Sequence, residues 1–109
     1  MPNVLDRVAE LGVVPVIAID SAAHALPLAD ALLAGGLPVV EITFRTAAAA
    51  EEIRILGKER PDLITGAGTV LTPETVKIAV DAGARFAVSP GLNPRVVKAA
   101  QELGLPFVP

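Results

Sequence analysis

Three polar side chains, Glu41, Thr43 and Arg45, interrupt a short apolar segment near the middle of this 109-residue sequence. Strand-like alternation over Pro38–Thr46 places these three on one face and apolar side chains on the other. A carboxylate within an apolar strand is costly unless it is paired or used. Glu41 and Arg45 would lie about 13 Å apart along an extended strand, too far for an easy direct bond. Each therefore faces some other partner, as in a binding or catalytic site, although an edge strand with solvated charges explains the pattern equally well.

A second candidate is the glycine-containing segment Thr65–Glu74. Gly66 and Gly68 remove side chains where a ligand or another backbone segment comes close, and Thr69 then offers a hydroxyl and an N–H group. A dinucleotide fingerprint, G-x-G-x-x-G, would need its third glycine at Leu71, so it is absent, and so is the Gly-Lys-Ser/Thr of a phosphate-binding loop. A tight turn from strand to helix explains the glycines but not Thr69.

The segment Ser89-Pro90-Gly91 follows the next apolar run in the same way. All three candidate segments fall at or near the carboxyl ends of predicted strands, where active sites of α/β proteins are built. With a single histidine, His24, and no cysteine, the sequence indicates no metal site. The lysines lie on predicted helices, away from the strand ends, and so do Glu51 and Glu52, which are interpreted as solvated helix residues.

The elements that position these residues form a repeat. Short, mostly β-branched apolar runs recur every 20 to 25 residues, roughly the length of one strand and one helix. They begin near Val13, Pro38, Leu63, Arg85 and Leu105. Such continuous runs are typical of parallel strands that are covered on both faces or enclosed in a barrel.

Helix signals lie between these runs. Ser21 and Thr46 are predicted N-caps of helices over 22–33 and 47–58, and Thr72-Pro73 and Asn93-Pro94 each pair an N-cap with a first-turn proline. Glycines predict the helix ends, at Gly35-Gly36, Gly83 and Gly104. A leading helix is predicted before Val13 from the spacing of Val4, Leu5, Val8 and Leu11.

The pattern predicts one α/β domain over residues 1–109, a helix followed by (βα)4β with parallel strands. Two architectures fit it: a five-stranded doubly wound sheet, or the N-terminal half of a (β/α)8 barrel. The composition is 52% hydrophobic with a net charge of −3 and almost no aromatic residues, which argues against disorder and nucleic-acid binding. No apolar run is long enough for a membrane span and no secretory signal begins the chain, so a cytoplasmic protein is expected.

Five motifs occur in an order that resembles the N-terminal half of the 2-dehydro-3-deoxy-phosphogluconate (KDPG) aldolases, which also act as 4-hydroxy-2-oxoglutarate aldolases. They are Val-Val-Pro-Val-Ile (13–17), Ala-Gly-Gly (34–36), Val-Glu-Ile-Thr-Phe-Arg-Thr (40–46), Gly-Ala-Gly-Thr-Val-Leu (66–71) and Ala-Val-Ser-Pro-Gly-Leu (87–92). The resemblance covers nearly the whole chain from Val13. It implies a (β/α)8 barrel assembled as a homotrimer, and it favours the half-barrel over the doubly wound sheet.

The resemblance also implies a function and a set of site residues. The family consists of class I aldolases, carbon–carbon lyases of the Entner–Doudoroff pathway that use no metal or cofactor. A lysine forms a Schiff base with the pyruvate part of a 2-keto acid substrate. By motif, Glu41 resembles the general acid/base, Arg45 the group that holds the pyruvate carboxylate, Thr69 a neighbour of that carboxylate and carbonyl, and Pro90 a residue of the pocket wall.

The sequence departs from the family in one respect: the Schiff-base lysine of these enzymes lies on the sixth strand. None of Lys58, Lys77 and Lys98 matches it, and the phosphate-binding loops near the last strands are missing as well. The chain is therefore interpreted as a barrel truncated in its fifth strand and inactive alone. Two other functions stay open: an aldolase for the galactonate-derived epimer, and a non-catalytic flavodoxin-like binding module.

Overall fold

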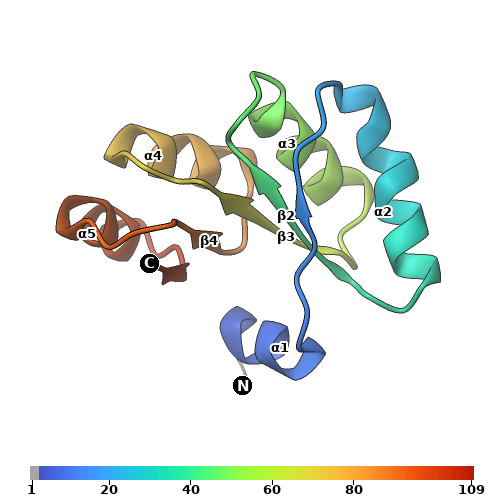
Figure 1. Ribbon diagram of the computed structural model, residues 1–109, viewed down its shortest axis with the longest axis horizontal. Coiled ribbons are helices and arrows are strands. Elements are labelled where there is room, and N and C mark those ends of the chain that lie inside the picture. Colours follow the sequence, from blue (N-terminus) through green and yellow to red (C-terminus); the bar gives the residue numbers. More distant parts are fainter. Residues whose placement is uncertain (1–2) are drawn as a thin grey trace.

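The computed structural model describes residues 3–109 and consists of strands that alternate with helices (Figure 1). The helices are α1 (Val4–Leu11), α2 (Ala25–Ala34), α3 (Ala49–Glu59), α4 (Pro73–Ala82) and α5 (Pro94–Glu102), with a 3₁₀ turn η1 at Ala22–His24. The strands are β1 (Val16–Ile17), β2 (Val39–Thr43), β3 (Ile64–Gly68), β4 (Ala87–Val88) and β5 (Phe107–Val108). The predicted order, a helix followed by (βα)4β, is therefore observed.

The order of the strands decides between the two predicted architectures. All five strands are parallel, and their order in the sheet, β1-β2-β3-β4-β5, is their order in the sequence. Buried residues of α2, α3, α4 and α5 pack in one cluster with Val40 and Ile42 of β2 and Ala67 of β3, so all four helices cover the same face. A doubly wound sheet needs a reversal of strand order and helices on both faces. The half-barrel prediction is confirmed.

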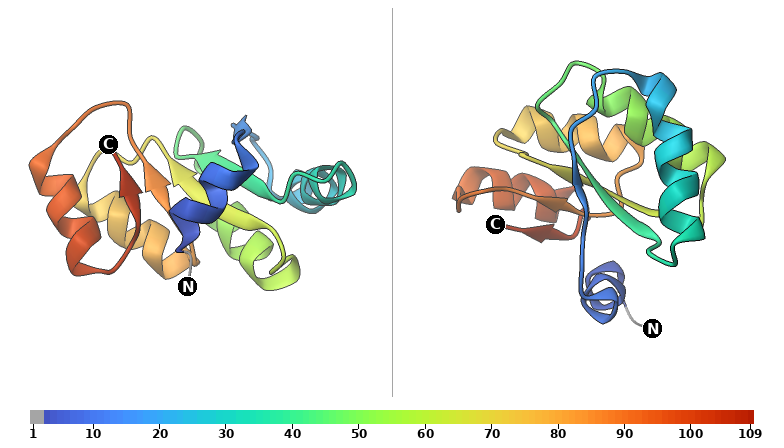
Figure 2. Two further views of the ribbon diagram at one scale, coloured as in Figure 1. Left: turned by 90° about the horizontal axis from the view of Figure 1, so that it is seen from below. Right: turned by 45° about the vertical axis from the view of Figure 1, so that its right-hand side comes forward.

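The opposite face of the sheet, here called the inner face, is covered at its amino-terminal end by α1. Val39, Ile64 and Phe86 form a second buried cluster against the apolar side of that helix. The two further views show α1 apart from the other helices (Figure 2). Because α1 occupies the amino ends of the strands, the carboxyl ends of the inner face are left for a site.

Most predicted helix caps are confirmed. The Thr72 hydroxyl accepts a hydrogen bond from the Thr75 N–H, and the Asn93 side chain accepts one from the Arg95 N–H. The predicted cap at Thr46 is wrong: α3 begins two residues later than expected, and the Thr46 hydroxyl instead donates to the Ile19 carbonyl. The Thr46 hydroxyl bonds to an acceptor from a distant segment instead of capping the helix that follows it.

Glu52 contradicts its sequence interpretation as a solvated helix residue. Its side chain is fully buried, and neither carboxylate oxygen has a hydrogen-bond partner among residues 3–109. Burial raises the pKa of Glu52, and the nearby negative charge of Asp20 raises it further. The fold therefore carries the cost of an unpaired carboxyl group behind the sheet.

In residues 3–109, no helix is long and apolar enough to cross a membrane.

We expect Glu52→Met to stabilise the fold, and more so at high pH. A raised pKa in the folded state means that the carboxyl stays protonated at no cost below its ordinary pKa, and that stability is lost as pH rises through the folded-state pKa. At pH 8 the free energy of unfolding should rise by about 1–3 kcal/mol, the usual cost of a buried unpaired polar group, with a smaller gain at pH 4. Urea denaturation at both pH values measures this. The exposed neighbour Glu51→Met is the control, and an equal effect of the two variants would contradict the interpretation.

Candidate active site

The predicted site residues come together at the carboxyl ends of three adjacent strands. Glu41 lies in β2, Thr69 directly follows β3, and Ser89-Pro90 directly follow β4. Arg45 lies in the turn after β2 rather than on the strand, so the alternation predicted through residue 45 stops at Thr43. Arg45 is therefore exposed at the rim of the sheet, while the carboxylate of Glu41 lies within the sheet.

Glu41 is nearly buried in the centre of the sheet. Its side chain is 9% exposed, and β2 pairs with β1 on one side and β3 on the other, so the edge-strand explanation of its charge is wrong. Burial raises the pKa of Glu41, and the positive charge of Arg45 opposes that shift. A carboxyl group in this state gives up and takes back a proton closer to neutral pH than an exposed glutamate does.

An aromatic ring lies over Gly66, the residue of β3 that pairs with Glu41. Phe86 is buried on the inner face, and a Cβ atom added to Gly66 would overlap its ring. Gly66 therefore gives the ring its place against the backbone of β3. Phe86 and α1 cover the amino end of the inner face, below the level of Glu41.

Thr69 adopts a backbone conformation that threonine disfavours. Its φ angle is +57°, the only positive φ of a non-glycine residue in the part of the chain that the structure describes. A β-branched residue in the left-handed region is strained, and such strain is typical of binding and catalytic sites. Thr69 follows Gly66 and Gly68, the glycines for which the sequence predicts a close approach. It lies at the carboxyl ends of β2, β3 and β4 on the inner face, which are here called the mouth of the sheet.

Two threonine hydroxyls hold the first strand against the second. Thr43 donates to the Ile17 carbonyl and Thr46 donates to the Ile19 carbonyl, each at 3.2 Å. These bonds fix the segment after β1 beside the mouth. Neither bond could be predicted from the sequence, because an acceptor 26 or 27 residues away leaves no local pattern.

Pro90 forms part of the wall of a cavity of about 380 Å³ between the loops after β3 and β4. Its mostly apolar lining includes Val70, Leu71 and Leu92. The Ser89 hydroxyl donates to the Gly91 carbonyl at 2.6 Å, which shapes this loop. Ser89 thus has a structural partner, whereas Pro90 is exposed at the rim.

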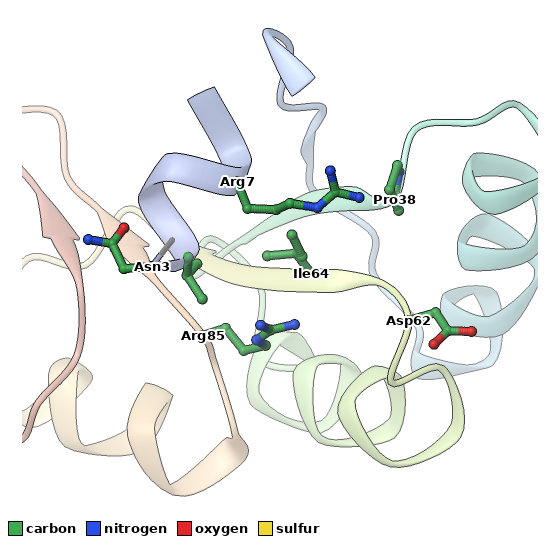
Figure 3. Close-up of a pocket in the computed structure, with 7 residues that line it drawn as sticks. Asn3, Arg7, Pro38, Asp62, Ile64 and Arg85 are labelled. Carbon is green, nitrogen blue, oxygen red and sulfur yellow. The ribbon is translucent and has the colours of Figure 1, made fainter. Parts of the chain in front are cut away.

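A second cavity, of about 270 Å³, lies at the amino end of the sheet, and its lining includes Arg7, Ile64 and Arg85 (Figure 3). The two arginines lie on either side of Ile64, which begins β3. This cavity lies at the opposite end of β3 from Thr69, so it is separate from the mouth.

No group of three or more metal-binding side chains occurs among residues 3–109. The lysines are all exposed on helices: Lys58 on α3, Lys77 on α4 and Lys98 on α5. No lysine lies on any strand of the described chain. The carboxyl ends of the strands therefore present a carboxyl group and a guanidinium, but no amine from residues 3–109.

Comparisons with known proteins agree with this geometry. The family model for KDPG and KHG aldolase matches residues 4–109. The 2-dehydro-3-deoxy-phosphogluconate aldolase of Haemophilus influenzae is 53% identical over 107 residues, which are 98% of this chain and 50% of that protein. The KHG/KDPG aldolase of Escherichia coli is 50% identical over 97 residues, 89% of this chain and 46% of that protein.

Solved structures show the same fold. The KDPG aldolase of Legionella pneumophila, captured with pyruvate as a covalent carbinolamine intermediate, superposes with a TM-score of 0.84 at 46% identity. It is matched over 88% of this chain and 47% of its own length. The chain spans about half the length of the relatives it matches. Its strand order, its motifs and these matches agree, and the chain belongs to the KDPG and KHG aldolase family.

Proposed function

We propose that the mouth of this sheet is the pyruvate-binding part of a class I aldolase site. The proposed reaction cleaves 2-dehydro-3-deoxy-6-phosphogluconate to pyruvate and glyceraldehyde 3-phosphate, in the cytoplasm. The observation that carries the proposal is the position of Glu41, a nearly buried carboxylate in a central strand, close enough to Arg45 for its pKa to respond to that charge.

Each site residue has a proposed role that suits its chemistry. Arg45 holds the substrate carboxylate, since a planar guanidinium binds a carboxylate through two parallel hydrogen bonds. Thr69 lies beside that carboxylate and the adjacent carbonyl, and Pro90 forms the pocket wall.

Glu41 moves protons during the reaction. In its neutral form it protonates the hydroxyl that leaves the carbinolamine as water. As a carboxylate it accepts the proton of the C4 hydroxyl while the C3–C4 bond breaks, which releases the aldehyde. A pKa raised by burial makes the neutral form more accessible than it is for an exposed glutamate. The amine of the Schiff base comes from a lysine outside these 109 residues.

The relatives favour the gluconate-derived substrate over its epimer. Proteins named KDPG aldolase reach 53% identity to this chain, whereas the structure titled native KDPGal is 25% identical. The site residues proposed here contact the pyruvate part, which both substrates share. The choice of substrate therefore rests on the relatives and not on Glu41 or Arg45.

We also propose that the protein works as a homo-oligomer, a trimer as in the family resemblance. The strands β1 and β5 each pair with only one neighbour, so each leaves one row of backbone groups unpaired within the described chain. Val13, Val16 and Val108, at or near these strands, are exposed apolar side chains. Further chain and further copies would cover these surfaces.

The direct test of the proposal is Glu41→Gln in the full-length gene product. The amide keeps the shape of the side chain but cannot carry a proton between two groups, so kcat should fall by roughly 10²–10⁴-fold with pyruvate binding nearly unchanged. Arg45→Lys should mainly raise KM, because a point charge replaces a two-pronged clamp. Steady-state kinetics and a thermal melt on the same preparations measure both. An unchanged kcat for Glu41→Gln, with an altered melting temperature, would mean that Glu41 is structural.

Thr69→Gly should raise stability while it weakens substrate binding. Glycine relieves the backbone strain at φ +57°, which stabilises the folded state by about 1–3 kcal/mol. It also gives the unfolded chain more conformational freedom, which destabilises the fold by about 0.4–1 kcal/mol. The free energy of unfolding should therefore rise by roughly 1 kcal/mol, and KM should rise because the hydroxyl is lost. Urea denaturation and kinetics measure the two effects. Thr69→Ala removes the hydroxyl but keeps the strain, so it separates them; full activity of both variants would exclude a substrate role for Thr69.

The 109-residue chain alone should trap no pyruvate when it is treated with borohydride. Its lysines lie on exposed helix surfaces and not at the mouth, so none is placed to form the Schiff base. Intact-mass spectrometry after reduction measures the adduct, with the full-length gene product as the positive control. An adduct on Lys58, Lys77 or Lys98 would contradict this account of the chain.

A further inference from the structure

We propose that Gly68 is a positioning residue for the acid/base of this site: its lack of a side chain lets the Glu41 carboxylate lie against the backbone of β3. The inference rests on the proposed function of Glu41. It adds to that function the element that sets where the carboxylate lies in the mouth.

The register of the sheet brings the two residues together. Glu41 pairs with Gly66 and Thr43 pairs with Gly68, two positions further along, so Glu41 and Gly68 belong to successive pairs on the inner face. The Glu41 side chain leans toward the carboxyl end of the strands and ends over Gly68. An ideal Cβ atom at Gly68 would lie 2.7 Å from Cδ and 2.9 Å from Cγ of Glu41, and its nearest contact would be Oε2.

These contacts are closer than carbon atoms approach in proteins, so the carboxylate and a side chain at position 68 exclude each other. The backbone does not require glycine here, since Gly68 lies in β3 and its φ angle is not positive. What requires glycine is the space that the Glu41 carboxylate occupies. The same reasoning applies one pair earlier, where Gly66 makes room for the Phe86 ring and not for the carboxylate.

The position has a chemical consequence. Gly68 directly precedes the strained Thr69, so the carboxylate lies over the end of β3 beside the residue proposed to contact the substrate. A methyl group at position 68 would push the carboxylate off β3 and toward the open mouth. There it would be better hydrated, and it would ionise at lower pH than in the parent protein.

The experiment compares Gly68→Ala with the parent in the full-length gene product. We expect kcat to fall by roughly 10–100-fold with less than a threefold change in KM, because proton transfer depends on the position of the group. We also expect the limb of the kcat profile that reports Glu41 to move to lower pH. The control is Gly57→Ala in α3, where a Cβ meets nothing within 4 Å and φ is not positive; it should leave kcat and the pH profile unchanged.

A double-mutant cycle with Glu41→Ala tests the contact itself, independently of catalysis. Gly68→Ala should lower the melting temperature when Glu41 is present and should leave it unchanged, or raise it, when position 41 is alanine. If Gly68→Ala does not fold alone, recovery of folding in the double variant supports the proposal. An equal loss of stability in both backgrounds, or an unfolded double variant, overturns it.

The two readouts separate the two claims. Coupling in the melting temperatures together with full turnover of Glu41→Gln would keep the contact but remove the catalytic role, and with it the positioning role proposed for Gly68. Coupling in the melting temperatures together with an unshifted pH profile in Gly68→Ala would show that Gly68 only avoids a steric clash and does not set the state of the carboxylate. That result also overturns the proposal.

Discussion

The burial of one carboxylate in a central parallel strand is the constraint on which the rest of this structure depends. Glu41 is nearly buried between the neighbouring strands β1 and β3, and the Phe86 ring lies over Gly66, its pair partner on β3. Such a group costs free energy in any fold, and the cost is the physical cause of its raised pKa. Gly68 on β3 supplies the space for the carboxylate, and the positive charge of Arg45 limits the rise of its pKa. The burial that lowers the stability of the fold at Glu41 also raises the pKa of its carboxyl group, which suits proton transfer.

The surrounding architecture makes that burial possible. Helices α2 to α5 cover the outer face of the sheet, so none of them covers the carboxyl end of the inner face. At its amino end, α1 packs over Val39, Ile64 and Phe86 and closes that side. The turn that carries Arg45 and the strained Thr69 border the opening at the other, carboxyl end of this face. The hydroxyls of Thr43 and Thr46 hold the segment after β1 beside the same opening.

Much of this could be predicted from the sequence, and the failures share a cause. Strand and helix order, the caps at Thr72 and Asn93, and the gathering of Glu41, Thr69 and Pro90 at one edge all follow from local patterns and from parallel topology. The predictions of a Thr46 cap and a solvated Glu52 were wrong because each residue's environment comes from distant segments. For Thr46 it is the Ile19 carbonyl, and for Glu52 it is the tertiary packing that buries its side chain near Asp20. The reason for Gly68 was likewise invisible, since it lies in the side chain of another strand.

The most direct test of the central claim is the titration of the Glu41 side chain, followed by carbon NMR on full-length protein labelled at glutamate carboxyl carbons and assigned with Glu41→Gln. The account predicts a pKa above the ordinary glutamate range, because burial outweighs the charge of Arg45. It also predicts a further rise in Arg45→Gln, where the opposing charge is removed. A Glu41 carboxyl that titrates at or below the ordinary value would contradict the account.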